Sequence, residues 1–138
     1  LSPAGLRVGV SVSPTIPFAN QPELETILEA ARDAGASRAS SIPLRLPWEV
    51  APLFEDWLRR HLPERADRVL ARVREMRGGQ LNDARFGSRF RGEGVWAELR
   101  AQRFHKASAR LGLGREDFVY DFSRFRPPLA TGAQARLF

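Results

Sequence analysis

Apolar and polar residues alternate from Leu6 to Val12, and this alternation constrains the fold more than any other feature of the chain. A period of two is typical of a β-strand, and Pro14 marks its expected end. Apolar residues at helical spacing follow over Leu24–Ala31, and a second, weaker strand is expected at Arg38–Leu44. Strand, helix and strand within about 40 residues predict a βαβ unit with parallel strands and a right-handed crossover.

Residues with known preferences for helix ends flank the expected first helix. Asn20 or Gln21 is a candidate N-cap, with Pro22 at the first helical position. Gly35 follows the last turn, where a left-handed conformation ends many helices. These positions predict where the crossover helix begins and ends.

Beyond Leu46 the sequence is helical in pattern. Two apolar stripes begin near Pro52 and Pro63, and a third extends from Trp96 to Leu111. Two parallel strands cannot form an independent sheet, because both faces and both edges need cover. We therefore expect an α/β protein in which residues 1–46 are the last strands of a partial α/β barrel. Residues 47–114 are expected to form a helical extension with an Arg/Gly-rich loop, and residues 115–138 an extended tail.

Composition excludes several classes of protein. The 138 residues are 43% apolar and 28% charged, which is typical of a folded domain. No apolar run approaches the roughly 20 residues that span a bilayer, so no membrane partner is expected. The chain has no cysteine, which favours a cytoplasmic protein without disulfides and leaves no thiolate to bind a metal or an iron–sulfur cluster. We expect no metal site in this chain.

The basic charge of the chain is concentrated between Arg60 and Arg91. The net charge is +6, and nine arginines against four acidic residues in that segment account for +5 of it. Such a patch attracts phosphate backbones, although a genome that favours arginine over lysine produces the same skew.

A long loop between Arg77 and Gly94 contains five glycines and four arginines. Loops of this length are commonly functional. Arginine binds phosphate, glycine permits close backbone approach, and an aromatic ring can stack on a base. In the competing interpretation the rings anchor the loop to the core, and the arginines pair with nearby carboxylates. The candidate nucleic-acid residues are Arg85, Arg89, Arg91, Phe86 and Phe90.

The strings LRLPWEV, LFEDWL, HLPERADRV, RGGQLND and FGSRFRGEG follow one another between Leu44 and Gly94. In this order they resemble the C-terminal part of the spore photoproduct lyase-like radical S-adenosylmethionine proteins, often labelled DNA repair photolyases. The resemblance implies a partial barrel of βα units. It also implies S-adenosylmethionine and a [4Fe–4S] cluster in the intact protein, the cluster being held by a Cys-x-x-x-Cys-x-x-Cys loop upstream of Leu1.

The resemblance further implies that the ends of the two strands contact the cofactor, since ligands of α/β barrels lie at the C-terminal ends of strands. Phe18 stands where the family usually has glycine, after a turn that stacks against the adenine. Arg45 could pair with a carboxylate or phosphate at the barrel mouth. The cofactor-binding residues implied are Pro14, Ile16, Pro17, Asn20, Leu44 and Arg45.

Two hypotheses for function follow. In the first, the intact protein is a lyase-like radical S-adenosylmethionine enzyme acting on nucleic acid, and this chain supplies adenine-side contacts and a basic loop on the substrate side. By itself the chain binds no cofactor and is expected to be inactive. In the alternative, the chain is a cluster-free module that binds nucleic acid or a protein partner without catalysis. In either case the uncovered strands predict self-association of the isolated chain.

The last residues of the chain suggest a separate partner. Gln134, Leu137 and Phe138 form a terminal Gln-x-x-Leu-Phe sequence, which resembles the peptide by which bacterial repair proteins dock on the replication sliding clamp. A tail folded onto its own domain explains Leu137 and Phe138 equally well.

Overall fold

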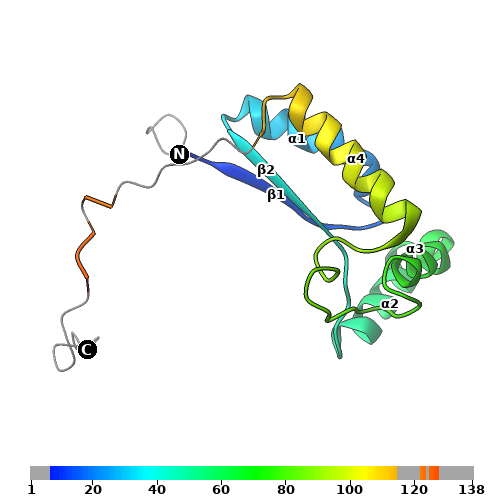
Figure 1. Ribbon diagram of the computed structural model, residues 1–138. Coiled ribbons are helices and arrows are strands. Elements are labelled where there is room, and N and C mark those ends of the chain that lie inside the picture. Colours follow the sequence, from blue (N-terminus) through cyan, green and yellow to red (C-terminus); the bar gives the residue numbers. More distant parts are fainter. Residues whose placement is uncertain (1–6, 115–121, 124, 128–138) are drawn as a thin grey trace, which may run out of the picture.

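The computed structural model describes residues 7–114, 122–123 and 125–127 of the chain. Within these residues the protein is mixed α/β, with a two-stranded parallel sheet and four α-helices (Figure 1). The elements in chain order are β1 (Gly9–Thr15), the 3-10 turn η2 (Gln21–Glu23), α1 (Leu24–Asp33), β2 (Arg38–Pro43), α2 (Val50–His61), α3 (Pro63–Glu75) and α4 (Gly94–Arg110). The predicted α/β class and the βαβ unit are confirmed, whereas the partial barrel stays a prediction.

The strands β1 and β2 pair in parallel, with Val12 opposite Ser41. The first strand is longer than its pattern predicts, because it continues through Pro14 to Thr15, which lies opposite Pro43. A register irregularity between Val12 and Thr15 accommodates the proline. Proline has no N–H to donate to a sheet, so it is tolerated where the ladder is interrupted.

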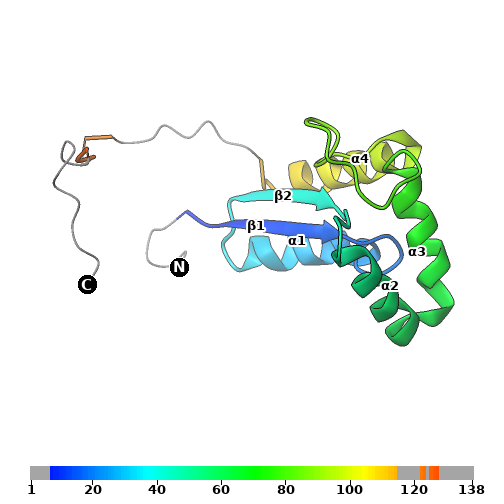
Figure 2. The same ribbon diagram turned by 90° about the horizontal axis from the view of Figure 1, so that it is seen from below.

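Helices α1 and α4 cover one face of the sheet, side by side (Figures 1 and 2). Val12 of β1 packs there with Leu24 and Leu28 of α1 and Phe104 of α4, all of them buried. The opposite face carries exposed serines and has no helix over it within the described residues (Figure 2). The serine hydroxyls on that face bond to one another, Ser11 to Ser13 at 3.1 Å and Ser40 to Ser11 at 3.2 Å.

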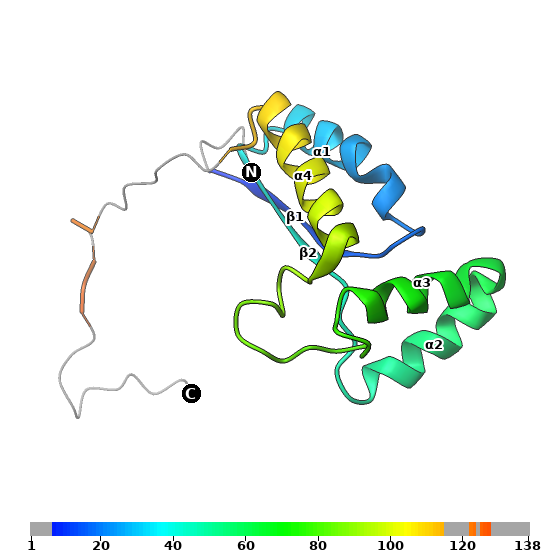
Figure 3. The same cartoon turned by 45° about the vertical axis from the view of Figure 1, so that its right-hand side comes forward.

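Helices α2 and α3 form a second layer beyond the end of β2 (Figure 3). Leu58 of α2 and Val69 and Val73 of α3 are fully buried in a cluster that also contains Leu44 and Leu46, the residues that follow β2. The α3 helix begins at the proline that its apolar stripe predicts and ends before Gly78, whose φ is +63°. The segment after β2 is therefore fixed by the same core that joins α2 to α3.

None of the helices in the described part of the chain has the length and apolar character needed to cross a bilayer. Within the same residues no group of three or more His, Cys, Asp or Glu side chains is placed to hold a metal ion. The clamp-binding residues predicted in the tail, Gln134, Leu137 and Phe138, lie outside the described residues.

Candidate nucleic-acid interface

The Arg/Gly-rich loop lies at the C-terminal end of β2. Figure 3 shows the chain leaving α3, making a wide excursion and returning to α4. The loop is joined to the segment after β2 by a backbone bond from the Leu46 N–H to the Leu81 carbonyl, at 2.9 Å. At its other end the Glu93 N–H donates to the Met76 carbonyl at 3.0 Å, which closes the excursion.

A buried arginine holds the loop against the strand end. The side chain of Arg77 is only 2% exposed, and its guanidinium donates five hydrogen bonds to four backbone carbonyls. Two of these carbonyls belong to Pro43, the last residue of β2, and to Leu44, the next residue, and they lie 2.9 and 3.1 Å from Nη2. The other two belong to Ser88 and Arg89 in the loop, at 3.1 and 2.9 Å from Nη1. Burial lowers the pKa of Arg77, and nearby Asp83 partly opposes that effect.

The carboxylate of Asp83 folds the middle of the loop. It is 7% exposed and accepts a backbone bond from the Arg85 N–H at 3.0 Å, two side-chain bonds from Arg85, and one from the Ser88 hydroxyl at 2.6 Å. Hydrogen bonding to Arg85, followed by that to Ser88, lowers the pKa of Asp83 well below its usual range. The side chain of Asp83 accepts a bond from the N–H two residues on, which is the arrangement of a turn.

The outer side of the loop carries arginines interleaved with aromatic rings. The Arg89 guanidinium carbon lies 5.1 Å from the ring centre of Phe86 and 4.6 Å from that of Phe90. The guanidinium carbon of Arg45, from the segment after β2, lies 5.7 Å from the Phe90 ring centre. We call the surface formed by Arg45, Phe86, Arg89 and Phe90 the arginine–aromatic face, and we include Arg91 because it is exposed and follows Phe90 directly in the chain.

Within the described residues, the arginines of this face have no acidic partner. None of Arg45, Arg89 and Arg91 forms an ion pair with a carboxylate of the described residues. The rings do not anchor the loop either, since Phe86 is 91% exposed and Phe90 is 44% exposed. The alternative in which the rings bind the core therefore does not describe this loop.

Arg85 differs from the other three arginines. Its guanidinium pairs with Asp83 at 2.9 Å and with Glu93 at 3.0 Å, although much of the side chain is exposed. The carboxylate-pairing interpretation therefore describes Arg85, and its positive charge is already balanced. Sequence spacing did not distinguish it from Arg89 and Arg91, because the choice depends on how the loop folds around Asp83.

The residues implied to contact a cofactor lie at the ends of the two strands. Most of them are buried or already hydrogen-bonded within the protein. The Ile16 N–H donates to the Asn20 side-chain oxygen at 2.7 Å, and the Asn20 amide donates to the Pro14 carbonyl at 3.0 Å. Pro17 and Leu44 are buried. The turn therefore offers apolar surface from Pro14 and Ile16 but no unused N–H at Ile16, so it fits a stacking contact with an adenine and not a hydrogen bond from that donor.

Two local predictions in this turn need correction or completion. Asn20 makes no capping bond to the helix, because its side chain bridges Pro14 and Ile16 instead. Phe18, in the position where the family usually has glycine, adopts φ +59°, a left-handed conformation that glycine tolerates better. Its ring lies 5.5 Å from that of Trp96, with the Arg68 guanidinium 4.4 Å above it, so packing compensates for the strained backbone.

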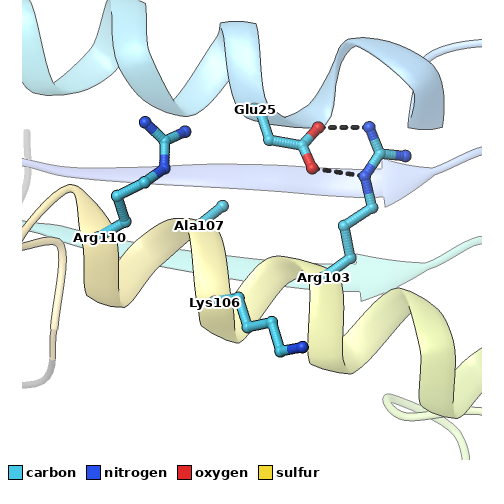
Figure 4. Close-up of a pocket in the computed structure, with 5 residues that line it drawn as sticks. All are labelled: Glu25, Arg103, Lys106, Ala107 and Arg110. Atoms are coloured by element: carbon cyan, nitrogen blue, oxygen red, sulfur yellow. Dashed lines mark hydrogen bonds and ion pairs between the residues drawn. The ribbon is translucent and has the colours of Figure 1, made fainter.

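A depression of about 350 Å³ between α1 and α4 is a second location to consider (Figure 4). There Arg103 makes a two-bonded ion pair with Glu25 and also donates to the carbonyls of Gln21 and Pro22, both at 3.1 Å. The hydrogen bond from Arg103 lowers the pKa of Glu25. Because these groups satisfy one another's hydrogen bonds, the depression is a structural contact between α4 and the start of α1.

Sequence reasoning missed Arg77, which organises the site, although a signal was present. Arg77 stands four residues after Val73 and seven after Leu70, and it therefore continues the apolar stripe of α3. A charged residue on an apolar stripe indicates a buried charge with dedicated partners. Arg100 occupies the same kind of position on α4, between Ala97 and Phe104.

Comparison of the chain with protein-family models, with curated proteins and with solved structures finds no match. The resemblance to radical S-adenosylmethionine proteins therefore stays a prediction, and the proposal for function depends on the geometry of the arginine–aromatic face.

Proposed function

We propose that this chain binds single-stranded or unstacked nucleic acid through the arginine–aromatic face. The observation that carries the proposal is the pair of exposed rings of Phe86 and Phe90, with the half-buried Arg89 stacked on both. Arg45 lies against Phe90, and neither arginine is paired to a carboxylate within the described residues. Cations without acidic partners are available to phosphate oxygens. Exposed rings are available to bases, which stack on them irrespective of sequence.

The loop is suited to this role because hydrogen bonds with two buried residues fix its backbone. Arg77 holds the carbonyls of Ser88 and Arg89, and Asp83 holds Ser88 and Arg85. The backbone that presents Phe86 and Phe90 is therefore already ordered before any ligand arrives, which lowers the entropy lost on binding. Stacking contributes about 1–3 kcal/mol per base in proteins of this kind.

The proposal is tested by the salt dependence of binding to a fluorescently labelled oligothymidine, measured by anisotropy. The double variant Arg89→Gln/Arg91→Gln is expected to bind more weakly. Its slope of log affinity against log salt should be smaller by about 1.4, because each phosphate contact to a single strand contributes about 0.7.

The matched control for this experiment is Arg59→Gln/Arg60→Gln. It removes the same charge from α2, where both arginines are exposed and pair with Asp67 and Asp56. The control should keep the wild-type slope. Equal slopes for the wild type and the loop variant would show that the loop is architectural and would overturn the proposal.

A second candidate function is that this nucleic-acid surface belongs to a radical S-adenosylmethionine enzyme of the spore photoproduct lyase-like type. The observation that favours it is the sheet itself, in which one face of the two parallel strands has no helix over it within the described residues (Figure 2). Ser11, Ser13 and Ser40 of these strands are exposed. Further strands would continue such a sheet into a barrel, with the arginine–aromatic face near its mouth.

In that setting Pro14 and Ile16 would offer apolar contact to the adenine of S-adenosylmethionine, which supplies radical chemistry when a [4Fe–4S] cluster is bound. This chain contributes no thiolate to such a cluster. Three cysteine codons at the Cys-x-x-x-Cys-x-x-Cys spacing, in frame upstream of Leu1, would support the candidate. A gene that lacks them would leave a binding module without catalysis.

A further inference from the structure

Arg100 of α4 is a buried cation whose guanidinium makes few hydrogen bonds to the part of the chain that the structure describes. The residue is 6% exposed, and Nη1 donates to the Ser41 hydroxyl oxygen of β2 at 2.9 Å. That is the one hydrogen bond its guanidinium makes within the described residues. Its Nε is enclosed and has no acceptor among these residues. No carboxylate of the described residues forms an ion pair with it.

The surroundings of Arg100 add to the cost of its charge. Burial lowers the pKa of Arg100, and the neighbouring positive charge of Arg77 lowers it further. Buried charges in proteins are almost always paired or fully hydrogen-bonded, because desolvation is otherwise uncompensated. Arg103, one turn further along α4, illustrates the usual arrangement, since it is fully engaged by Glu25 and two carbonyls.

We propose that Arg100 and Ser41 form a binding site for an oxyanion, namely a carboxylate or a phosphate group. A guanidinium presents parallel N–H groups that match the two oxygens of such an anion. Because the Ser41 oxygen accepts a bond from Arg100, its own O–H remains to be donated, and it has no acceptor within the described residues. The anion is either carried by a small molecule or belongs to an acidic side chain that docks beside β2.

The site is tested by thermal unfolding of the full chain in chloride, with inorganic phosphate or acetate added. The wild type should show a saturable rise in melting temperature above the unsaturable effect that such salts have on all proteins. Arg100→Met should lose the saturable part. In chloride alone it should melt at or above the wild-type temperature, because it removes an uncompensated buried charge.

Arg59→Met is the matched control, because it removes one arginine from an exposed position on α2. It should keep the saturable rise. Saturation at lower phosphate than acetate assigns the site to a phosphate-bearing molecule, and the reverse assigns it to a carboxylate. If neither anion gives a saturable rise, or if Arg100→Met keeps it, the proposal is wrong.

A direct measurement avoids dependence on the stability of the variant. In an NMR spectrum of arginine side chains, the Nε–H signal absent from Arg100→Lys should shift saturably with the anion that stabilises the protein. An unshifted signal would overturn the site. No oligonucleotide is present in either experiment, so the result is independent of nucleic-acid binding at the arginine–aromatic face.

Discussion

Two regions of the molecule place an arginine in the interior, and they satisfy it in opposite ways. Where the loop meets β2, Arg77 donates to four carbonyls, and all three nitrogens of its guanidinium are hydrogen-bonded. Where α4 meets the sheet, Arg100 donates only to Ser41 among the described residues, and its enclosed Nε has no acceptor there. Arg77 therefore belongs to the architecture of the loop, whereas Arg100 has one hydrogen-bond partner and no acidic partner among the described residues.

The two arginines differ in the number of backbone carbonyls that their surroundings offer as acceptors. Carbonyls of irregular backbone are obligatory acceptors, and a loop that turns away from helix and strand leaves them to be satisfied by side chains. Arg77 supplies the donors for carbonyls of the loop and for carbonyls at the end of β2. Arg100 instead lies within a regular helix, whose backbone groups bond to one another, and no backbone carbonyl of β2 accepts a bond from it within the described residues.

The largest effect that separates the two regions is expected from Arg77→Met. The substitution leaves the carbonyls of Pro43, Leu44, Ser88 and Arg89 without their donor, and it should destabilise the protein by about 3–5 kcal/mol. Urea denaturation measures this change. Arg77→Lys should fall between the wild type and Arg77→Met, because an ammonium can replace some of the bonds but not the planar fork. If Arg77→Met and Arg100→Met changed stability equally, the contrast between the two regions would be lost.

A smaller and more local effect is expected from Asp83→Asn. Arg85 holds the pKa of Asp83 below its usual value, so the stability that this carboxylate contributes is present above pH about 4, the range of an unperturbed carboxyl. That stability is lost as the pH falls further, toward the lowered pKa of the folded state. Hydrogen exchange of the Arg85 and Arg89 amides should show several-fold lower protection in Asp83→Asn at pH 7. The variant and the wild type should converge at low pH, and equal protection at pH 7 would show that Asp83 does not hold the loop.

Sequence periodicity was sufficient to predict the βαβ unit and the three later helices. Apolar residues such as Val12, Leu28 and Val73 occur at the spacing of the element that buries them, and the structure places all three in a core. The end of β1 was not predictable in the same way. Pro14 normally ends a strand, and only the register irregularity opposite β2 allows the chain to continue to Thr15.

The sequence predicted which residues make up the candidate site, but it did not predict which arginines pair with carboxylates. Arg85, Arg89 and Arg91 look equivalent in the sequence, yet Asp83 and Glu93 bind only Arg85 among them. That choice depends on distances across the loop, which spacing does not contain. Arg77 and Arg100 were missed because arginine is usually exposed, although both stand on apolar stripes.

The contact between base and ring tests the central claim most directly. Phe86 and Phe90 can be followed by the ¹³C–¹H NMR signals of their rings while oligothymidine is added to the chain. Bases that stack on the arginine–aromatic face should shift both ring signals upfield and saturably, and Arg89→Gln should weaken the saturation. Binding of the oligonucleotide with unchanged signals from Phe86 and Phe90, or no binding at all, would contradict the proposed function.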